Sequence, residues 1–142
     1  MPSEMSVADL MTNDVVTLTE DETLALAQRC MARGRIRHLP VVRKGKLVGL
    51  ITHRDLLAAS FSIFAEVEAS EQRRIFDTVR VVELMHRDVV AVSPSLPVSK
   101  AARILLENKY GCLPVVDDEQ QLQGIVTEAE FLRLTVQLLP CP

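Results

Sequence analysis

The chain has no tryptophan, only 4% aromatic residues and only 5 glycines in a length of 142 residues. Its apolar runs all fall short of the roughly 20 residues that a membrane-spanning helix needs. The first four residues, Met1–Glu4, lack the basic start and the apolar stretch of a secretory signal peptide. We therefore expect a cytoplasmic protein with no membrane partner.

Cysteine is also scarce. Cys30, Cys112 and Cys141 are odd in number and have neither C-x-x-C spacing nor a nearby histidine pair. Neither a disulfide framework nor a metal site is therefore predicted. We expect Cys30 and Cys112 to be small buried apolar residues and Cys141 to be an exposed free thiol.

An excess of charge of one sign is absent as well. The formal net charge is −3, so no global positive field exists that would attract nucleic-acid phosphates. Hydrophobic residues make up 48% of the chain and charged residues 25%, which is the composition of a globular protein. We predict a protein that is folded nearly from end to end and has no nucleic-acid partner.

An internal repeat is the strongest feature that the sequence does have. Three blocks recur in the same order at an offset of 74 residues, and a fourth recurs at an offset of 75. The extra residue is expected in the second hairpin turn, because loops absorb insertions. The paired blocks are Val7–Met11 with Val81–Met85, Asp14–Val16 with Asp88–Val90, His38–Val42 with Cys112–Val116, and Gly49–Thr52 with Gly124–Thr127.

Each copy shows the same order of predicted elements. The β-branched runs Val15–Leu18 and Val89–Val92 predict short buried strands. An apolar helical stripe follows each run, and we expect Gly34 to end the first helix and Gly111 the second. A hairpin and a last helix come next, so each copy reads β-α-β-β-α.

The hairpin turn and the helix starts complete the predicted architecture. The first hairpin turns at Lys44-Gly45, and Thr52 and Thr127 stand where they would cap the last helices. The predicted fold class is α/β (α+β), with two β-α-β-β-α repeats and a helical linker insert. Residues 1–57 form the first repeat, 58–80 the linker and 81–139 the second repeat.

The linker is too long for a simple connection. Phe61, Phe64, Val67, Ile75 and Val79 recur at roughly helical spacing, and neither glycine nor proline interrupts them. We predict an extended or broken amphipathic helix. Its apolar stripe either packs back onto the sheets or forms a dimer or partner surface.

The repeated blocks resemble the CBS domain family, named after cystathionine beta-synthase. The resemblance covers almost the whole chain apart from the linker and the tail, and its motifs occur twice in register. Any one motif alone would be weak, but the doubled combination is specific. The matching features are the leading segments Asp9–Met11 and Glu83–Met85, the strands Leu39–Val42 and Leu113–Val116, and the signatures Gly49–Asp55 and Gly124–Glu130.

The resemblance implies how such a chain works. It implies two repeats packed as a pseudo-two-fold module, with two clefts that can each hold AMP, ADP, ATP, S-adenosylmethionine or a relative. Such modules usually regulate an attached or associated enzyme, channel or transporter. The expectation here is a stand-alone homodimer that needs no cofactor, takes an adenosine-containing ligand and regulates a protein partner.

The first signature is the clearest candidate site. A strand ending at Thr52 and a helix starting at His53 would direct backbone N–H groups and the positive end of the helix dipole at a phosphate. The resemblance assigns Asp55 the ribose contact, and its carboxylate can accept two hydrogen bonds from a cis-diol. His53 and Arg54 could meet phosphates. The alternative is that Thr52 and Asp55 form a capping pair that only closes the helix start.

The second signature departs from the family pattern. Glu130 replaces the aspartate, and it reaches one methylene further while still accepting hydrogen bonds. Glu128 adds negative charge where a phosphate would lie beside Thr127. We therefore expect a less anionic ligand in this cleft, or none.

A basic edge precedes the middle strand of the first copy. In the family, residues at this place often reach phosphates beside the partner repeat, so Arg37 and His38 could face Glu130. The alternative is a solvated cluster of surface charges. The adenine ring would need an apolar slot, and Val16, Ile36 and Ile51 are candidate walls, although each is also an ordinary core residue.

These features are compatible with more than one class of function. The leading hypothesis is a sensor that binds an adenosine-containing ligand in the cleft between its repeats and changes its packing, through different affinity for two arrangements. The alternative is a ligand-independent dimerisation or protein-interaction scaffold. An enzyme is not expected, because His38, His53 and His86 fall at different element edges and no catalytic motif is present.

Overall fold

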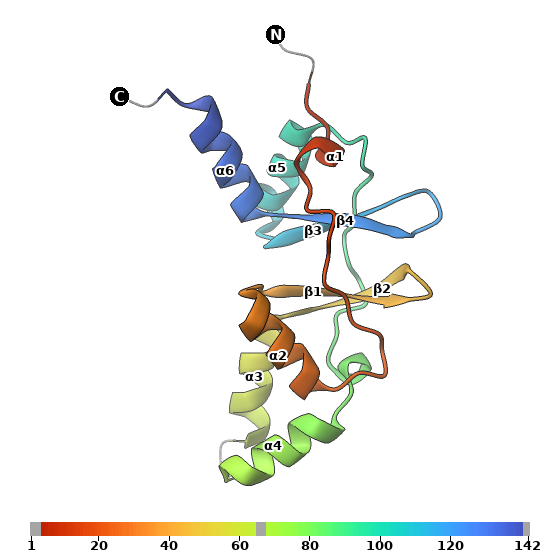
Figure 1. Cartoon of the computed structure of the whole chain (residues 1–142), viewed down its shortest axis with the longest axis vertical. Helices are drawn as coiled ribbons and strands as arrows, with labels where there is room; N and C mark the ends of the chain where they lie inside the picture. The colour runs from red at the N-terminus through yellow and green to blue at the C-terminus, as the bar shows by residue number, and fades with distance from the viewer. Residues whose placement is uncertain (1–3, 65–67, 141–142) are drawn as a thin grey trace. The chain divides into compact units, whose positions relative to one another are not determined.

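The computed structural model describes residues 4–64 and 68–140, which divide between two compact units (Figure 1). Unit 1 contains residues 1–15 and 90–142, and unit 2 contains residues 16–89. The units do not follow the order of the repeats along the chain. The leading segment of each repeat packs in the unit that holds the hairpin of the other repeat.

The two units contain the same kinds of element. Unit 1 contains α1 (Val7–Leu10), α5 (Val98–Asn108), β3 (Cys112–Val116), β4 (Leu122–Thr127) and α6 (Glu128–Leu138). Unit 2 contains α2 (Leu24–Gly34), β1 (His38–Arg43), β2 (Lys46–Thr52), α3 (His53–Phe64), α4 (Ala69–Thr78) and the 3-10 turn Val81–Glu83. The predicted α/β class with a helical linker insert is confirmed.

Each unit has one two-stranded antiparallel sheet, and the five residue pairs of the second sheet all have an equivalent in the first, which adds the pair Arg43 with Lys46. Both carry an irregularity at the same place, between Val41 and Val42 and between Val115 and Val116. Lys44 and Gly45 have φ angles of 51° and 81°, the left-handed pair that a tight two-residue hairpin turn requires. The extra residue of the second copy lies in the longer turn between Val116 and Leu122, as predicted.

The leading runs do not form the buried strands expected from their β-branched residues. Leu18 and Val92 each make one parallel bridge, to Val41 and Val115. Extending the first bridge by one step would need an N–H at Pro40 to donate to the carbonyl of Val16, and proline has none. Pro114 blocks the second bridge in the same way, so the prediction of strands was wrong because the Leu-Pro-Val motif itself stops the pairing.

A hydrophobic core fills the inner side of each sheet. In unit 2 it includes the fully buried Leu18, Leu24, Leu39, Val41 and Ile51. The linker helix α4 adds Phe76, with Ile75 and Val79 packed beside it, so this part of the linker packs back onto its own unit. The side chains of Phe61, Phe64 and Val67 lie outside the described part of the structure. In unit 1 the core is built on Val7, Ala101, Leu113, Val115 and Val126.

No helix within residues 4–64 and 68–140 combines the length and the apolar character that crossing a membrane requires.

Candidate functional site

The junction of β2 and α3 forms the capping pair that the Thr-x-x-Asp pattern suggested. The backbone N–H of Thr52 donates to Asp55 Oδ2 at 2.8 Å, and the N–H of Asp55 donates to Thr52 Oγ1 at 3.2 Å. The N–H of His53 donates to the carbonyl of Arg37 at 2.8 Å. Three backbone donors at this helix start are thus already used within the protein, and an incoming phosphate would have to rely on side chains as well.

The second oxygen of Asp55 has a partner that is distant in sequence. His86 Nε2 lies 2.8 Å from Asp55 Oδ1. A carboxylate can only accept, so the histidine nitrogen carries the proton in this contact. The Asp55 side chain is 16% exposed and the His86 side chain 59% exposed, so the pair lies at the surface of unit 2 with the carboxylate largely covered.

The backbone of His86 is fixed against the edge of β2. Its N–H donates to the carbonyl of Leu50 at 2.8 Å, and the N–H of Leu50 donates back to the carbonyl of His86 at 2.9 Å. Gly49 allows this close approach, since a Cβ at that position would lie 2.5 Å from Met85 Sδ and 3.0 Å from the His86 carbonyl oxygen. The glycine of the signature therefore serves to seat the leading segment of the other repeat.

Unit 1 repeats this arrangement with different side chains. Thr12 occupies the place of His86, and its backbone exchanges hydrogen bonds with Ile125 at 2.9 and 3.1 Å. A Cβ at Gly124 would lie 2.7 Å from Met11 Sδ and from the Thr12 carbonyl oxygen. The hydroxyl of Thr12 donates to Glu130 Oε1 at 2.8 Å, so Glu130 corresponds to Asp55 in partner as well as in position.

Glu130 is more completely occupied than Asp55. Its Oε2 accepts from the Thr127 N–H at 2.8 Å and also from the Thr127 hydroxyl. Burial alone would raise the pKa of Glu130, but the hydrogen bonds from Thr127 and Thr12 outweigh it and lower the pKa below its usual value. The carboxylate is thus held ionised in a site where its side chain is 10% exposed.

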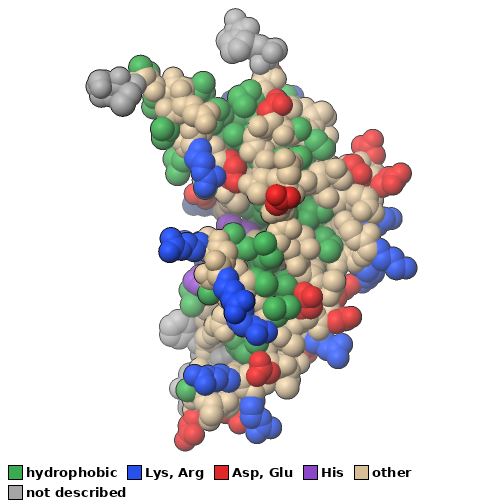
Figure 2. Space-filling model, viewed as in Figure 1, with side chains coloured by type: hydrophobic (Ala, Val, Ile, Leu, Met, Phe, Trp, Pro, Cys, Tyr) green, Lys and Arg blue, Asp and Glu red, His purple; other side chains and the backbone are tan. Residues whose placement is uncertain are grey.

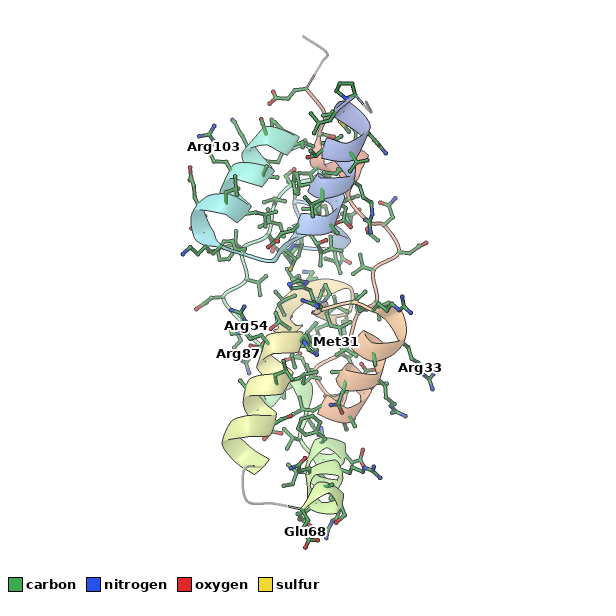
Figure 3. The ribbon with its side chains drawn as sticks, turned by 90° about the vertical axis from the view of Figure 1, so that its left-hand side faces the viewer. Met31, Arg33, Arg54, Glu68, Arg87 and Arg103 are labelled. Atoms are coloured by element: carbon green, nitrogen blue, oxygen red, sulfur yellow. The ribbon has the colours of Figure 1, made fainter. Side chains whose placement is uncertain are left out.

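A pocket of about 470 Å³ in unit 2 collects another group of the predicted residues. It lies between α2 and α3, which Figure 3 shows side by side with Met31 on the side of α2 that faces α3. Asp55 is not part of its lining, so the pocket and the carboxylate are separate features of α3. The apolar lining includes Met31, Ile36, Leu56 and Leu57, and the basic groups are Arg35, Arg37 and His53.

The predicted apolar walls are placed differently from one another. Ile51 is fully buried in the core of unit 2, and Val16 is exposed because the leading run forms no strand. Ile36 lines the pocket between α2 and α3. His38 begins β1 and pairs in register with Thr52, which brings the basic edge next to the signature. Thr127 and Glu130 belong to unit 1, so a role of Arg37 and His38 toward Glu130 stays a prediction.

Two residues that contact the signature acids were missed from the sequence. From the sequence, His86 is only one of three histidines at element edges, and Thr12 belongs to no predicted site. A signal was available, since each directly follows the methionine of a leading segment and the two are 74 residues apart. Arg87 is the next residue after His86, and Figure 3 shows Arg54 and Arg87 on the side of α3 turned away from α2. Cations thus lie on both faces of α3.

Clusters that could hold a metal were sought among the same residues. In the part of the chain that the structure describes, no three His, Cys, Asp or Glu side chains gather in a metal-binding arrangement.

Comparison with protein families identifies the repeat. The model of the family described as "CBS domain" matches residues 7–62 and again residues 81–136. Among curated proteins, a CBS domain-containing protein of Dictyostelium discoideum is 33% identical over 138 residues, which cover 96% of this chain and 95% of that protein.

Other curated relatives are longer than this chain. The uncharacterized protein MJ1225 of Methanocaldococcus jannaschii is 38% identical over 129 residues, covering 89% of this chain and 46% of that protein. An inosine-5′-monophosphate dehydrogenase of the same organism is 34% identical over 126 residues, covering 88% of this chain but 22% of the enzyme. The chain thus spans less than half of these two proteins, and only a minor part of the enzyme.

Solved structures with the same fold include complexes with adenosine compounds. CBSX2, a CBS-pair protein from Arabidopsis thaliana, was solved with AMP, with a TM-score of 0.78, 29% identity, and coverage of 94% of this chain and 98% of that chain. The CBS domain pair of MJ0100 was solved with 5′-methylthioadenosine and S-adenosyl-L-methionine (TM-score 0.77, 27% identity, 95% and 98% coverage). The cytosolic domain of the Mg²⁺ channel MgtE was solved with ATP (TM-score 0.72, 30% identity, 93% and 49% coverage).

Proposed function

Because the chain belongs to the CBS domain family and carries two CBS repeats, we propose that it is a regulatory module that binds an adenosine-containing ligand. Asp55 is the ribose acceptor in this proposal, and the ligand is AMP, ADP, ATP or S-adenosylmethionine. The module does no chemistry of its own and acts on a protein partner. The complexes of CBSX2, MJ0100 and MgtE support the ligand class, since each contains an adenosine compound.

The observation that carries the proposal is the state of Asp55. Its carboxylate is fixed at the helix start by the Thr52 N–H, yet its side chain stays 16% exposed at the surface of unit 2. A fixed carboxylate that keeps part of its surface exposed is a suitable acceptor for two adjacent hydroxyls, because little side-chain entropy is lost when the ligand binds. Arg54 and Arg87 stand next to Asp55 and His86 in the chain and supply positive charge for a phosphate or a carboxylate.

Calorimetric titration of the intact chain with AMP, ATP and S-adenosylmethionine tests the proposal. Asp55→Asn keeps the size of the side chain and one acceptor oxygen but removes the charge, and it should weaken binding by roughly tenfold or more. Glu22→Gln is the matched control, because Glu22 also accepts a backbone N–H from three residues earlier in unit 2, that of Thr19 at 3.1 Å. Absence of heat and of a thermal shift with all three ligands would refute the proposal.

A second function, self-association, is favoured by an apolar stripe on α6. Leu132 and Val136 lie four residues apart on α6 and are 67% and 76% exposed, Leu139 just beyond the end of the helix is 63% exposed, and Leu106 of α5 is also exposed. Figure 2 shows hydrophobic side chains gathered along α6. We expect a second copy of the chain to cover this stripe, as in a homodimer. A cytoplasmic location and a regulated protein partner stay predictions from the sequence.

Light scattering after size exclusion tests self-association. Leu132→Glu places a charge in the middle of the stripe and should convert a dimer to a monomer without changing ligand affinity. Gln137→Glu is the control, because Gln137 is an exposed residue of α6 next to Val136 and places the same charge outside the stripe. A wild-type protein that is monomeric at high micromolar concentration would contradict the expectation.

A further inference from the structure

The two signature acids differ in how much of their hydrogen-bonding capacity is already used. An ionised carboxylate offers about four lone-pair sites. Asp55 uses one for the Thr52 N–H and one for His86 Nε2. Two sites remain, which is the number that the two hydroxyls of a ribose cis-diol need.

Glu130 has fewer free hydrogen-bond acceptor sites than Asp55. It accepts from the Thr127 N–H, the Thr127 hydroxyl and the Thr12 hydroxyl, which leaves about one site of its four. Arg133 also approaches Glu130 Oε1 to 3.8 Å. A cis-diol could bind there only if one of these internal hydrogen bonds to Glu130 were given up first.

His86 determines where the free sites of Asp55 point. Its backbone is held by two hydrogen bonds to Leu50, and its ring donates to Oδ1 while the Thr52 N–H donates to Oδ2. Each oxygen of the Asp55 carboxylate therefore accepts a hydrogen bond from a different segment of the chain, and rotation about the Cβ–Cγ bond would break at least one of these bonds. Preorganised acceptors of this kind discriminate between ligands by geometry as well as by charge.

We infer that His86 is a positioning residue that holds Asp55 in the orientation that accepts a ribose cis-diol, and that the Thr12–Glu130 pair makes unit 1 a closed counterpart. The chain then binds one diol-bearing nucleoside ligand, not two. This inference rests on the proposed function and deepens it, since it names the group of the ligand that is recognised and the residue that sets the recognition.

The test compares AMP with 2′-deoxy-AMP, which lacks one hydroxyl of the diol but keeps the base and the phosphate. The wild-type chain should bind one AMP per chain and prefer it over 2′-deoxy-AMP by roughly tenfold or more. In His86→Ala this preference should fall to within about threefold, because the freed carboxylate no longer presents two sites together. His86→Gln retains an N–H donor and should restore most of the preference.

Arg87→Ala is the matched control for charge. It removes an exposed cation next to His86, so affinity for both nucleotides could fall, but their ratio should stay that of the wild type. Thermal unfolding of each variant checks that the fold is intact, and the exposed His86 side chain makes a large loss of stability unexpected.

The outcomes separate the inference from the proposed function. If the wild type binds neither nucleotide, both fail. If it binds AMP through Asp55 but His86→Ala keeps the full preference, or loses affinity equally for both nucleotides, only the positioning role fails. Two AMP per chain, or one AMP bound by Asp55→Asn with the affinity of the wild type, would overturn the conclusion that unit 1 is closed.

Discussion

Gly49 provides a direct test of how the leading segment is seated against β2. Substitution by alanine would add a methyl group 2.5 Å from Met85 Sδ and 3.0 Å from the His86 carbonyl oxygen. Carbon and its neighbours normally sit 3.5–4.0 Å apart, so the sulfur must move by about 1 Å or more. Met85 is buried in the core of unit 2, so it has little free space into which to move.

The cost of Gly49→Ala follows from two effects. Overpacking of a buried site costs about 1–3 kcal/mol. Shifting the backbone of His86 weakens its two hydrogen bonds with Leu50, each worth about 1 kcal/mol. Loss of backbone freedom in the unfolded chain gives back about 0.4–1 kcal/mol. The expected net destabilisation is about 2–3 kcal/mol, or a fall in Tm of roughly 10 °C.

Gly34→Ala is the control, because it makes the same chemical change where space exists. A Cβ at Gly34 would lie 3.4 Å from the Ile36 side chain, which is an ordinary contact. Gly34 is the last residue of α2, so its replacement by alanine should raise the free energy of unfolding by about 0.5–1 kcal/mol. Urea unfolding followed by circular dichroism is the suitable assay, since the chain has no tryptophan and its single tyrosine, Tyr110, lies in unit 1. If Gly49→Ala were as stable as the wild type, the close approach would not be the reason for this glycine.

Two further predictions concern unit 1. The pKa of Glu130 is lower in the folded chain than its unfolded value near 4.5. The ionised carboxylate therefore stabilises the fold above the unfolded pKa, and this stabilisation is lost as the pH falls through the folded pKa. In urea titrations, the difference in unfolding free energy between wild type and Glu130→Gln should shrink between about pH 7 and about pH 3. Burial, together with the charge of Glu130, raises the pKa of the Cys112 thiol to about 12. Iodoacetamide at about pH 8 should therefore leave Cys112 unmodified in the folded chain and alkylate it in urea. Equal alkylation rates of the folded and unfolded chain, measured by mass spectrometry, would contradict this.

The repeat made the architecture predictable, because four blocks in register define where each strand, turn and helix recurs. The turn at Lys44-Gly45 and the extra residue in the second hairpin turn are predicted from the sequence, and the positive φ angles of both turn residues agree with such a turn. The first helix ends where the sequence predicts, since Gly34 is the last residue of α2. The second prediction was wrong, because α5 ends at Asn108, three residues before Gly111. The residue after each helix, Arg35 or Lys109, has a positive φ angle of 51° or 57°, a conformation that glycine adopts more easily.

The partners of the signature acids could not be predicted, because they depend on which leading segment packs against which hairpin. A sequential division of the chain places His86 with the second repeat, whereas in space it contacts Asp55 of the first. Residues 31 positions apart with no periodic relation give no local signal. Only the 74-residue offset between Thr12 and His86 connects the two sites, and it indicates equivalent positions without indicating what they touch.

In each of the two equivalent pairs, the length of the donor side chain compensates for the length of the acid side chain. Unit 2 combines a long donor, His86, with the short acid Asp55, and unit 1 combines the short donor Thr12 with the longer acid Glu130. Both combinations bridge the gap between the leading segment and the helix start with a contact of 2.8 Å. Exchange of the acid alone would therefore break either contact. Asp55→Glu should crowd His86, and Glu130→Asp should leave the Thr12 hydroxyl too far from its acceptor. The double variant His86→Thr with Asp55→Glu should regain the stability that Asp55→Glu alone loses. A double-mutant cycle that shows no coupling energy between the two positions would refute this compensation.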